Sequence, residues 1–204
     1  MGKNLKIKCC CGKVEGTARD ISASSTNHVI CSCRSCQLYA HFLGRTDTML
    51  DAEGGSHIFQ MNPNKFEINQ GIDEVVAVRV TPNGPFRWHT RCCKTPLGNS
   101  FPRAGVPFLG VLPLCVGQDG GSSEFREIAG PVRAYVNKIG PSSLGEKVQV
   151  AAMLVRFSCM LLWWRIVGGR SAKPFFDAST GEPISEPFIM NRDVYEKLKA
   201  DANL

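Results

Sequence analysis

The stretch Cys31-Ser32-Cys33-Arg34-Ser35-Cys36 places three cysteines within six residues. Cys-x-Cys and Cys-x-x-Cys spacings form tight turns, from which thiolates converge on a tetrahedral zinc ion at about 2.3 Å from the metal. Four protein ligands close a zinc site, whereas three leave a position open for water or substrate. No histidine or acidic residue stands inside this motif. The sequence therefore predicts an open zinc site at Cys31, Cys33 and Cys36.

Two other clusters, Cys9-Cys10-Cys11-Gly12 and Cys92-Cys93, supply further ligands. Cys9 and Cys11 can lie on one side of a bend, because Gly12 permits the backbone conformation that such a bend needs. Two more ligands must come from elsewhere, and Cys92-Cys93 is the available source. We therefore expect a second, structural zinc ion on Cys9, Cys11, Cys92 and Cys93, whose binding free energy would contribute to folding.

The bulk composition is that of one globular domain, since 204 residues with 43% apolar content can bury a sizeable core. Residues 1–8 are basic and reach Cys9 without an apolar stretch, so no secretory signal is expected. The predicted location is the reducing cytoplasm, where clustered cysteines bind metal more often than they form disulfides. The net charge of +6 is scattered along the chain, so nucleic acid is not an expected partner.

From residue 5 to about residue 136 the pattern predicts short β-strands separated by Gly, Pro, Asn and Asp. The clearest element is a hairpin, in which Val76, Val78 and Val80 precede a turn at 81–85 and lead to Cys92 through a return strand. Phe86, Trp88 and Thr90 are expected to share one face of that return strand. Other strands are predicted at residues 13–17, 27–31, 57–61, 65–68 and 125–128. The expected fold is mainly β, with antiparallel sheets in a zinc-binding domain over residues 1–140.

Residues 141–204 are predicted to form a helical extension with an irregular tail, packed on the same domain. Ser142-Ser143 can cap a helix over residues 148–167 that stops at Gly168-Gly169, and a short final helix opens at Asn191. The long helix is apolar nearly all round. A membrane span would place Arg156 in mid-membrane at a cost of about 3 kcal/mol, so no membrane is expected. We expect the helix to pack on the β core or on a second copy in a homodimer, with Arg156 and Arg165 directing their charged heads outward.

The motifs resemble the glutathione-dependent formaldehyde-activating enzyme family, which includes the domain of centromere protein V. The resemblance rests on Cys9-x-Cys11-Gly12, Cys31-x-Cys33-x-x-Cys36 and a cysteine pair followed by Thr95-Pro96-Leu97, and it covers roughly residues 5 to 115. It implies a β-tent zinc fold with two zinc ions. A structural ion would lie on the first and last motifs, and a catalytic ion would lie on Cys31, Cys33 and Cys36.

The chain departs from the family in the last motif, which in the family reads Phe-Cys-x-x-Cys-Gly. Aligning the second cysteine with Cys93 places Thr90 at the position of the first and Lys94 at that of the glycine. Cys92 can substitute through a change of register, or Cys10 can. A three-coordinate structural zinc with water, or its loss, also remains open.

The resemblance implies a carbon-sulfur lyase or synthase acting on a thiol-aldehyde adduct such as S-hydroxymethylglutathione. A glutathione-type thiol would occupy the fourth position of the middle zinc, which lowers its pKa so that the thiolate can add to formaldehyde. Arg34 is a candidate for holding a carboxylate of the thiol, although a solvated turn residue is the more ordinary interpretation.

Several other residues that could carry chemistry are expected to have structural roles. We expect no catalytic base among the four histidines, and we expect Cys115 and Cys159 to be buried small apolar side chains. Trp163-Trp164 is predicted to belong to a core or an interface. The histidines are His28, His41, His57 and His89.

Two alternative functions remain open from the sequence. One is a non-catalytic zinc module that binds a protein or nucleic acid, and a fourth protein ligand on the middle zinc would favour it. The other is a thiol redox protein, for which the purified chain would be free of metal and its adjacent cysteines would cycle through disulfides.

Overall fold

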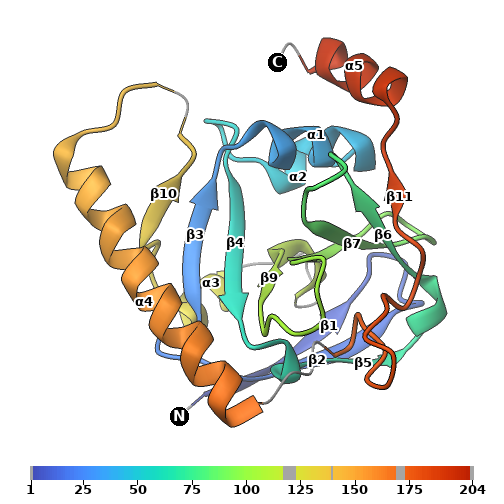
Figure 1. Cartoon of the computed structure of the whole chain (residues 1–204), viewed down its shortest axis with the longest axis horizontal. Helices are drawn as coiled ribbons and strands as arrows, with labels where there is room; N and C mark the ends of the chain where they lie inside the picture. The colour runs from blue at the N-terminus through green and yellow to red at the C-terminus, as the bar shows by residue number, and fades with distance from the viewer. Residues whose placement is uncertain (1, 117–122, 139, 169–172, 203–204) are drawn as a thin grey trace.

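A computed structural model describes residues 2–116, 123–138, 140–168 and 173–202. The fold is mixed α/β, with 34% helix and 30% strand, so the expectation of a mainly β protein understated the helix content. Two sheets, mostly antiparallel, form the body of the molecule, and one long helix runs along its side (Figure 1). The predicted antiparallel sheets and the helical extension are therefore present within a more helical fold.

The smaller sheet has three strands in the order β1-β2-β5, and the larger has eight in the order β10-β3-β4-β9-β8-β7-β6-β11. The strands are β1 Lys3–Lys8, β2 Glu15–Ile21, β3 Asn27–Cys31, β4 Ser56–Met61, β5 Phe66–Gln70, β6 Val75–Arg79, β7 Phe86–Thr90, β8 Pro96–Ser100, β9 Leu109–Val111, β10 Ala134–Val136 and β11 Phe188–Ile189. The helices are α1 Arg34–Leu43, α2 Thr46–Met49, α3 Ser123–Ala129, α4 Leu144–Gly168 and α5 Arg192–Asp201, with 3-10 turns at Pro63–Lys65, Ile72–Glu74 and Pro113–Cys115.

The predicted hairpin is confirmed as β6 and β7, which pair antiparallel with Val75 opposite Thr90 and Val78 opposite Arg87. Its return strand contributes Trp88 to the main core, where the indole is fully buried and stacks on Phe175 at 4.7 Å between ring centroids. The Trp88 indole N–H donates to Ser100 Oγ at 2.8 Å, so burial leaves that polar group satisfied. The C-terminal tail thus supplies part of the core of the β domain.

Two segments differ from the sequence-based expectation. Residues 125–128, predicted as a strand, lie inside helix α3, where Phe125 and Ala129 are buried four residues apart on one helical face. Residues 34–43, which follow the middle cysteine motif, form α1 with a C-cap at Gly44 (φ 65°). In addition, β10 with β3 and β11 with β6 pair parallel, so the larger sheet is not purely antiparallel.

Helix α4 begins with the predicted cap, because Ser143 Oγ accepts from the Glu146 amide and the Glu146 carboxylate accepts from the Ser143 amide. Its last residue is Gly168, and the predicted stop at Gly169 lies outside the described residues. The final helix, α5, is capped by Asn191, whose side chain accepts from the Val194 amide at 2.9 Å. Both helix starts are as the sequence predicts.

The sequence predicts that both arginines of α4 direct their charged heads outward. Arg165 is exposed, whereas Arg156 is half-buried against a loop. Arg156 Nη2 donates to the carbonyls of Ala23, Ser24 and Thr26 at 3.0 to 3.2 Å, and Arg165 Nη1 donates to the Gly105 carbonyl at 2.9 Å. These carbonyls belong to loops, and the Ala23 carbonyl also accepts from Arg133 Nη2 at 3.0 Å, so the guanidinium groups of α4 tie the helix to loop backbone.

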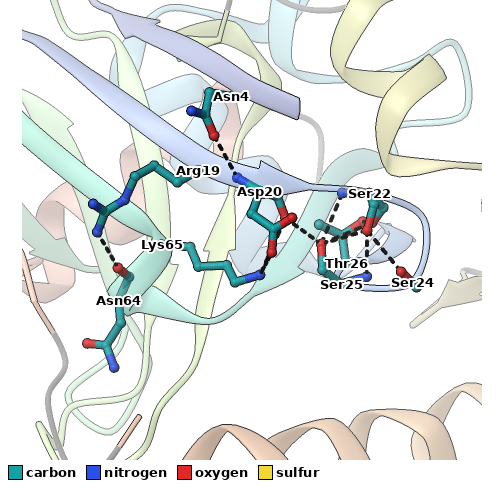
Figure 2. Close-up of polar contacts among 9 residues, drawn as sticks. All are labelled: Asn4, Arg19, Asp20, Ser22, Ser24, Ser25, Thr26, Asn64 and Lys65. Carbon is teal, nitrogen blue, oxygen red and sulfur yellow. Dashed lines mark hydrogen bonds and ion pairs between the residues drawn. The ribbon is translucent and has the colours of Figure 1, made fainter. Parts of the chain in front are cut away.

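Hydroxyl groups hold the loop that receives Arg156 in a compact turn (Figure 2). Ser25 Oγ donates to the Asp20 carbonyl at 3.0 Å, and Thr26 Oγ1 donates to the Ser22 carbonyl at 2.7 Å. Asp20 also pairs with Lys65 across the smaller sheet. These hydrogen bonds fix the conformation of the loop at residues 22–26, which Arg156 of α4 contacts.

By length and composition α4 could cross a membrane, and 17% of its most apolar window is buried in the fold. Its buried side chains, Met153 and Trp164, face the β domain. The helix lies beside β10 and β3 (Figure 1). Packing on the protein therefore occupies one side of α4 only.

Candidate metal centres

Four cysteines converge where the β1–β2 turn meets the β7–β8 turn. Cys9, Cys11, Cys92 and Cys93 bring their sulfur atoms within 4.8 Å of one another. The measured separations are 3.5 Å for Cys9–Cys11, 3.9 Å for Cys9–Cys92, 3.3 Å for Cys11–Cys92 and 3.8 Å for Cys92–Cys93. A tetrahedron with zinc-sulfur distances of 2.3 Å has edges of about 3.8 Å. The donor set and its spacing therefore fit a closed zinc site.

The local backbone explains why these sulfurs meet. Gly12 has a φ of 79° and donates its amide to the Cys9 carbonyl at 2.9 Å, which closes the bend predicted from the sequence. The Val14 amide donates to Cys9 Sγ at 3.2 Å. Cys10 is exposed and outside the group, whereas Cys92 belongs to it.

Thr90 lies at the position that the resemblance aligns with a cysteine. Its hydroxyl supports the cluster through a hydrogen bond. Its hydroxyl lies 3.4 Å from Cys93 Sγ, and the Thr95 hydroxyl lies 3.1 Å from the same sulfur. Burial alone would raise the pKa of Cys93, but these two hydroxyl contacts lower it to about 6. Burial raises the pKa of Cys92 to about 12. Cys93 is thus poised as a thiolate, which is the form that binds metal.

Three cysteines form the middle cluster at the junction of β3 and α1. Cys31 ends β3, Cys33 is the N-cap of α1 and Cys36 lies in its first turn. Their sulfurs lie within 4.8 Å of one another, with Cys31 and Cys36 buried and Cys33 partly exposed. The helical turn folds the motif back on itself, since the Cys36 amide donates to the Cys33 carbonyl at 2.9 Å. This cluster too could hold an ion such as zinc.

The middle cluster includes no fourth cysteine, histidine, aspartate or glutamate among the described residues. His28 lies earlier on β3 and is hydrogen-bonded to His57 Nδ1 at 2.9 Å and to the Gly130 carbonyl at 3.1 Å. His41 is in the last turn of α1. Neither histidine belongs to the group of sulfurs. Among the described residues, the group therefore consists of the three cysteines that the sequence predicts.

A buried arginine that the sequence reasoning missed faces the middle cluster. Arg87, on β7, is 3% exposed, and its Nη1 and Nη2 lie 3.8 and 3.7 Å from Cys36 Sγ. The guanidinium also donates to Ser35 Oγ at 2.9 Å and to Asn99 Oδ1 at 3.2 Å. No carboxylate pairs with it among the described residues. A buried cation needs an anion, so Arg87 indicates that the sulfurs carry negative charge, as metal-bound thiolates do.

A second donor reaches a different sulfur of the cluster. Asn137, after β10, donates from Nδ2 to Cys31 Sγ at 3.4 Å. Its φ of 54° is a left-handed conformation that is uncommon outside glycine, although asparagine adopts it more readily than most residues. Hydrogen bonds among the three sulfurs lower the pKa of Cys33 and raise the pKa values of Cys31 and Cys36, so one proton is lost from the group before the others. The surroundings therefore favour a thiolate in this cluster.

The remaining candidates supply no ligand to either cluster. Arg34 is exposed as the first residue of α1, Cys115 is buried, and Cys159 is exposed on α4, contrary to the expectation that it is buried. Trp164 is buried, whereas Trp163 is 61% exposed. Each of the ten cysteines is a free thiol. The sequence signal that could have found Arg87 was its position between Phe86 and Trp88, on the opposite face of the strand.

Residues 1–146 match a family described as "Family of unknown function (DUF6151)". The chain belongs to this family. The DUF6151 match contains all seven clustered cysteines, together with Arg87 and Asn137, and ends just after α4 begins. No curated protein matches the sequence. The matched region therefore includes both candidate metal centres, and the description of the family names no activity.

Proposed function

We propose that the chain is a zinc-dependent carbon-sulfur lyase or synthase that acts on a thiol-aldehyde adduct such as S-hydroxymethylglutathione. The observation that supports this proposal is the middle cluster, where Cys31, Cys33 and Cys36 converge without a fourth ligand of the usual kinds among the described residues. Three protein ligands are the pattern of a catalytic zinc site, and four are the pattern of a structural one. The resemblance to the formaldehyde-activating family suggests the chemistry.

The reaction joins a thiol to formaldehyde. The thiol gives up its proton, its sulfur forms a bond to the aldehyde carbon, and the carbonyl oxygen takes up a proton to become a hydroxyl. The reverse reaction breaks the same carbon-sulfur bond. A zinc ion at this site would supply a Lewis acid that keeps an incoming thiol deprotonated.

The residues around the cluster would control its charge and orientation. Three thiolates outweigh the charge of a divalent ion, and the Arg87 guanidinium beside Cys36 offsets the excess. Asn137 donates to Cys31, a different sulfur from the one that Arg87 contacts. Both groups act through the sulfur ligands, so they are positioning residues that orient the metal centre.

Two hollows at the connection between β10 and α4 could take the body of a thiol, and they are lined by sequence neighbours of the cluster and by none of its cysteines. Ser32 and Glu53 line the first hollow, Asn137 and Lys147 line the second, and the two share Tyr135, Lys138 and Glu146. The lysines provide positive charge for the carboxylates of a peptide thiol. Lys138 is already paired with Glu146 at 2.8 Å, so Lys147 is the better candidate.

The test measures zinc content and turnover of S-hydroxymethylglutathione, formed from glutathione and formaldehyde, on the same preparations. We expect wild type to turn over the adduct, and Cys33→Ser to lose nearly all turnover while it retains the other zinc ion. Cys10→Ser is the matched control, because Cys10 lies outside both clusters. An inactive zinc-loaded wild type, or a Cys33→Ser variant as active as wild type, would refute the proposal.

A second candidate function is a non-catalytic zinc module that binds a protein partner. The exposed apolar face of α4 favours it, because the helix presents Val155, Leu162 and Ile166 to solvent. This candidate predicts zinc-loaded protein without turnover of the adduct. The same assay therefore separates the two functions.

A further inference from the structure

The outer face of α4 carries an apolar stripe with no charged residue in it. The helix faces the β domain with Met153 and Trp164, and Arg156 anchors it to the loop at residues 22–26. The stripe consists of six exposed residues: Val148, Ala152, Val155, Cys159, Leu162 and Ile166. Figure 1 shows that this helix forms one border of the molecule, with its outer side free.

The spacing of the stripe is that of a helix-helix seam. Successive members are four, three, four, three and four residues apart, so at 100° per residue they stay within an arc of about 80°. The arc lies opposite Met153 and Trp164, the buried side chains of α4. Lys147, Ser158 and Arg165 lie along one edge of the stripe and none lies within it. An alternation of three and four residues is what knobs-into-holes packing between two helices requires.

The exposed apolar area is large enough for a stable contact. Val155, Leu162 and Ile166 are 67%, 63% and 68% exposed, and Trp163 adds a large ring beside them. The six residues of the stripe expose on the order of 600 Å² per copy, so two copies together would bury at most about 1,200 Å², which is the lower end of the range for a standard interface. A monomeric protein rarely leaves so large an apolar patch in water.

We propose that α4 is the interface of a two-fold symmetric dimer, with the stripes of two copies packed antiparallel. The stripe reads the same in both directions about residue 157, so every member meets another member in the antiparallel arrangement. Val155 faces Cys159 of the second copy, Ala152 faces Leu162, and Val148 faces Ile166. Each contact is between apolar side chains, and the charge-free stripe needs no complementary charge on its partner.

A lipid surface is the competing occupant, and the structure favours it less. Helices that lie on membranes keep a basic, solvated face opposite their apolar one. In α4 the opposite face packs on the protein through Met153 and Trp164, and the Arg156 guanidinium is occupied by loop carbonyls. The dimer does not depend on the zinc chemistry, so the proposed function and this interface can fail separately.

The first test is the mass of the full chain in solution, measured by light scattering during size exclusion and by sedimentation. We expect wild type to be a dimer and Val155→Glu to be a monomer, with dimer affinity reduced by about 100-fold or more because the carboxylate would be buried without a partner. Ser158→Glu is the matched control, since it adds the same charge to α4 at the edge of the stripe. Circular dichroism and zinc content establish that both variants fold.

Three outcomes would overturn the proposal. They are a monomeric wild type at all concentrations, a dimer that survives Val155→Glu, and a dimer that Ser158→Glu disrupts as strongly. Sedimentation with vesicles of phosphatidylcholine and phosphatidylglycerol separates the lipid alternative. We expect the dimer to stay in the supernatant, and a monomer that binds the vesicles through the stripe would assign α4 to a membrane surface.

A crosslinking test checks the antiparallel register. In the proposed dimer, Val155→Cys would lie directly opposite Cys159 of the second copy, so mild oxidation should give a covalent dimer on a non-reducing gel. Leu154→Cys is the control, because Leu154 is also exposed but lies outside the stripe. Combining Val155→Cys with Cys159→Ser should reduce the crosslink strongly. Equal crosslinking of the Val155 and Leu154 variants would contradict the register.

Discussion

At the residue scale, the middle cluster depends on a cation that lies fifty residues away in sequence. The buried guanidinium of Arg87 forms no ion pair with a carboxylate among the described residues and is directed at Cys36. It also lies over the Tyr39 ring, 5.3 Å from the centroid, which holds it on the face of α1. The residue therefore links the charge of the metal centre to the packing of β7 on α1.

Replacing Arg87 should weaken metal binding at the middle cluster only. We expect Arg87→Met to lower the zinc affinity of that site by about 10- to 100-fold, because the thiolates lose the cation that offsets their charge. Arg87→Lys should recover part of the loss, since it keeps the charge but not the forked contacts. Competition with a chromogenic chelator measures both affinities. Equal zinc affinity in wild type and Arg87→Met would contradict this role.

The buried side chain of His28 should make the free energy of unfolding depend on pH below neutrality. Burial lowers the pKa of His28 to about 4, so the ring is neutral in the folded protein and protonates near pH 6.5 when unfolded. This contribution to stability is present above pH 6.5 and is lost as the pH falls toward 4. It amounts to about 2 kcal/mol between pH 7 and pH 5. We expect His28→Gln, measured by urea unfolding at both pH values, to lose less stability on acidification than wild type.

At the element scale, two turns bring the four-cysteine cluster together. The β1–β2 turn carries Cys9 and Cys11 on the smaller sheet, and the β7–β8 turn carries Cys92 and Cys93 on the larger one. The cluster therefore connects the two sheets at their turns. This placement is typical of a structural zinc, whose binding stabilises the fold.

Loss of one ligand from this cluster should cost both a metal ion and stability. We expect Cys92→Ser to reduce bound zinc from two ions to one per chain and to lower the unfolding temperature by several degrees or more. Cys10→Ser should change neither, although Cys10 lies within the same motif. Elemental analysis and thermal unfolding provide the two measurements. Two zinc ions in Cys92→Ser would show that Cys92 is not a ligand.

At the scale of the whole molecule, the two sheets meet at the four-cysteine cluster, and α4 packs along one side. The C-terminal tail crosses the larger sheet, where β11 pairs with β6 and Phe175 packs on Trp88. Removing metal should therefore loosen the junction of the sheets more than the centre of the larger sheet.

Removing metal with a chelator should loosen the junction of the two sheets more than the centre of the larger sheet. We expect a strong chelator at neutral pH to increase amide hydrogen exchange most in β1 and β2, because Cys9 and Cys11 hold their turn to the larger sheet. Strands β8 and β9, which are buried in the larger sheet, serve as the internal control. Mass spectrometry of exchange before and after chelation measures the effect. Uniform loss of protection across all strands would contradict a local role for the metal.

The sequence by itself determined the features that depend on neighbouring residues. The spacing of Cys31, Cys33 and Cys36 predicts a shared centre, Gly12 predicts a bend, and Ser143 with Glu146 predicts the start of α4. These features require contacts over only a few residues, which backbone geometry restricts strongly. Local pattern failed at residues 125–128, where a short apolar run fits a strand or a helix equally well.

Only the tertiary structure decided which distant groups meet. It selected Cys92 over Cys10, directed Arg87 and Asn137 at the middle cluster, and turned Arg156 inward. Each of these contacts joins segments at least fifty residues apart, so it follows from strand register and packing, which local spacing does not specify. It also left the stripe of α4 exposed, because the residues that a helix buries depend on what packs against it.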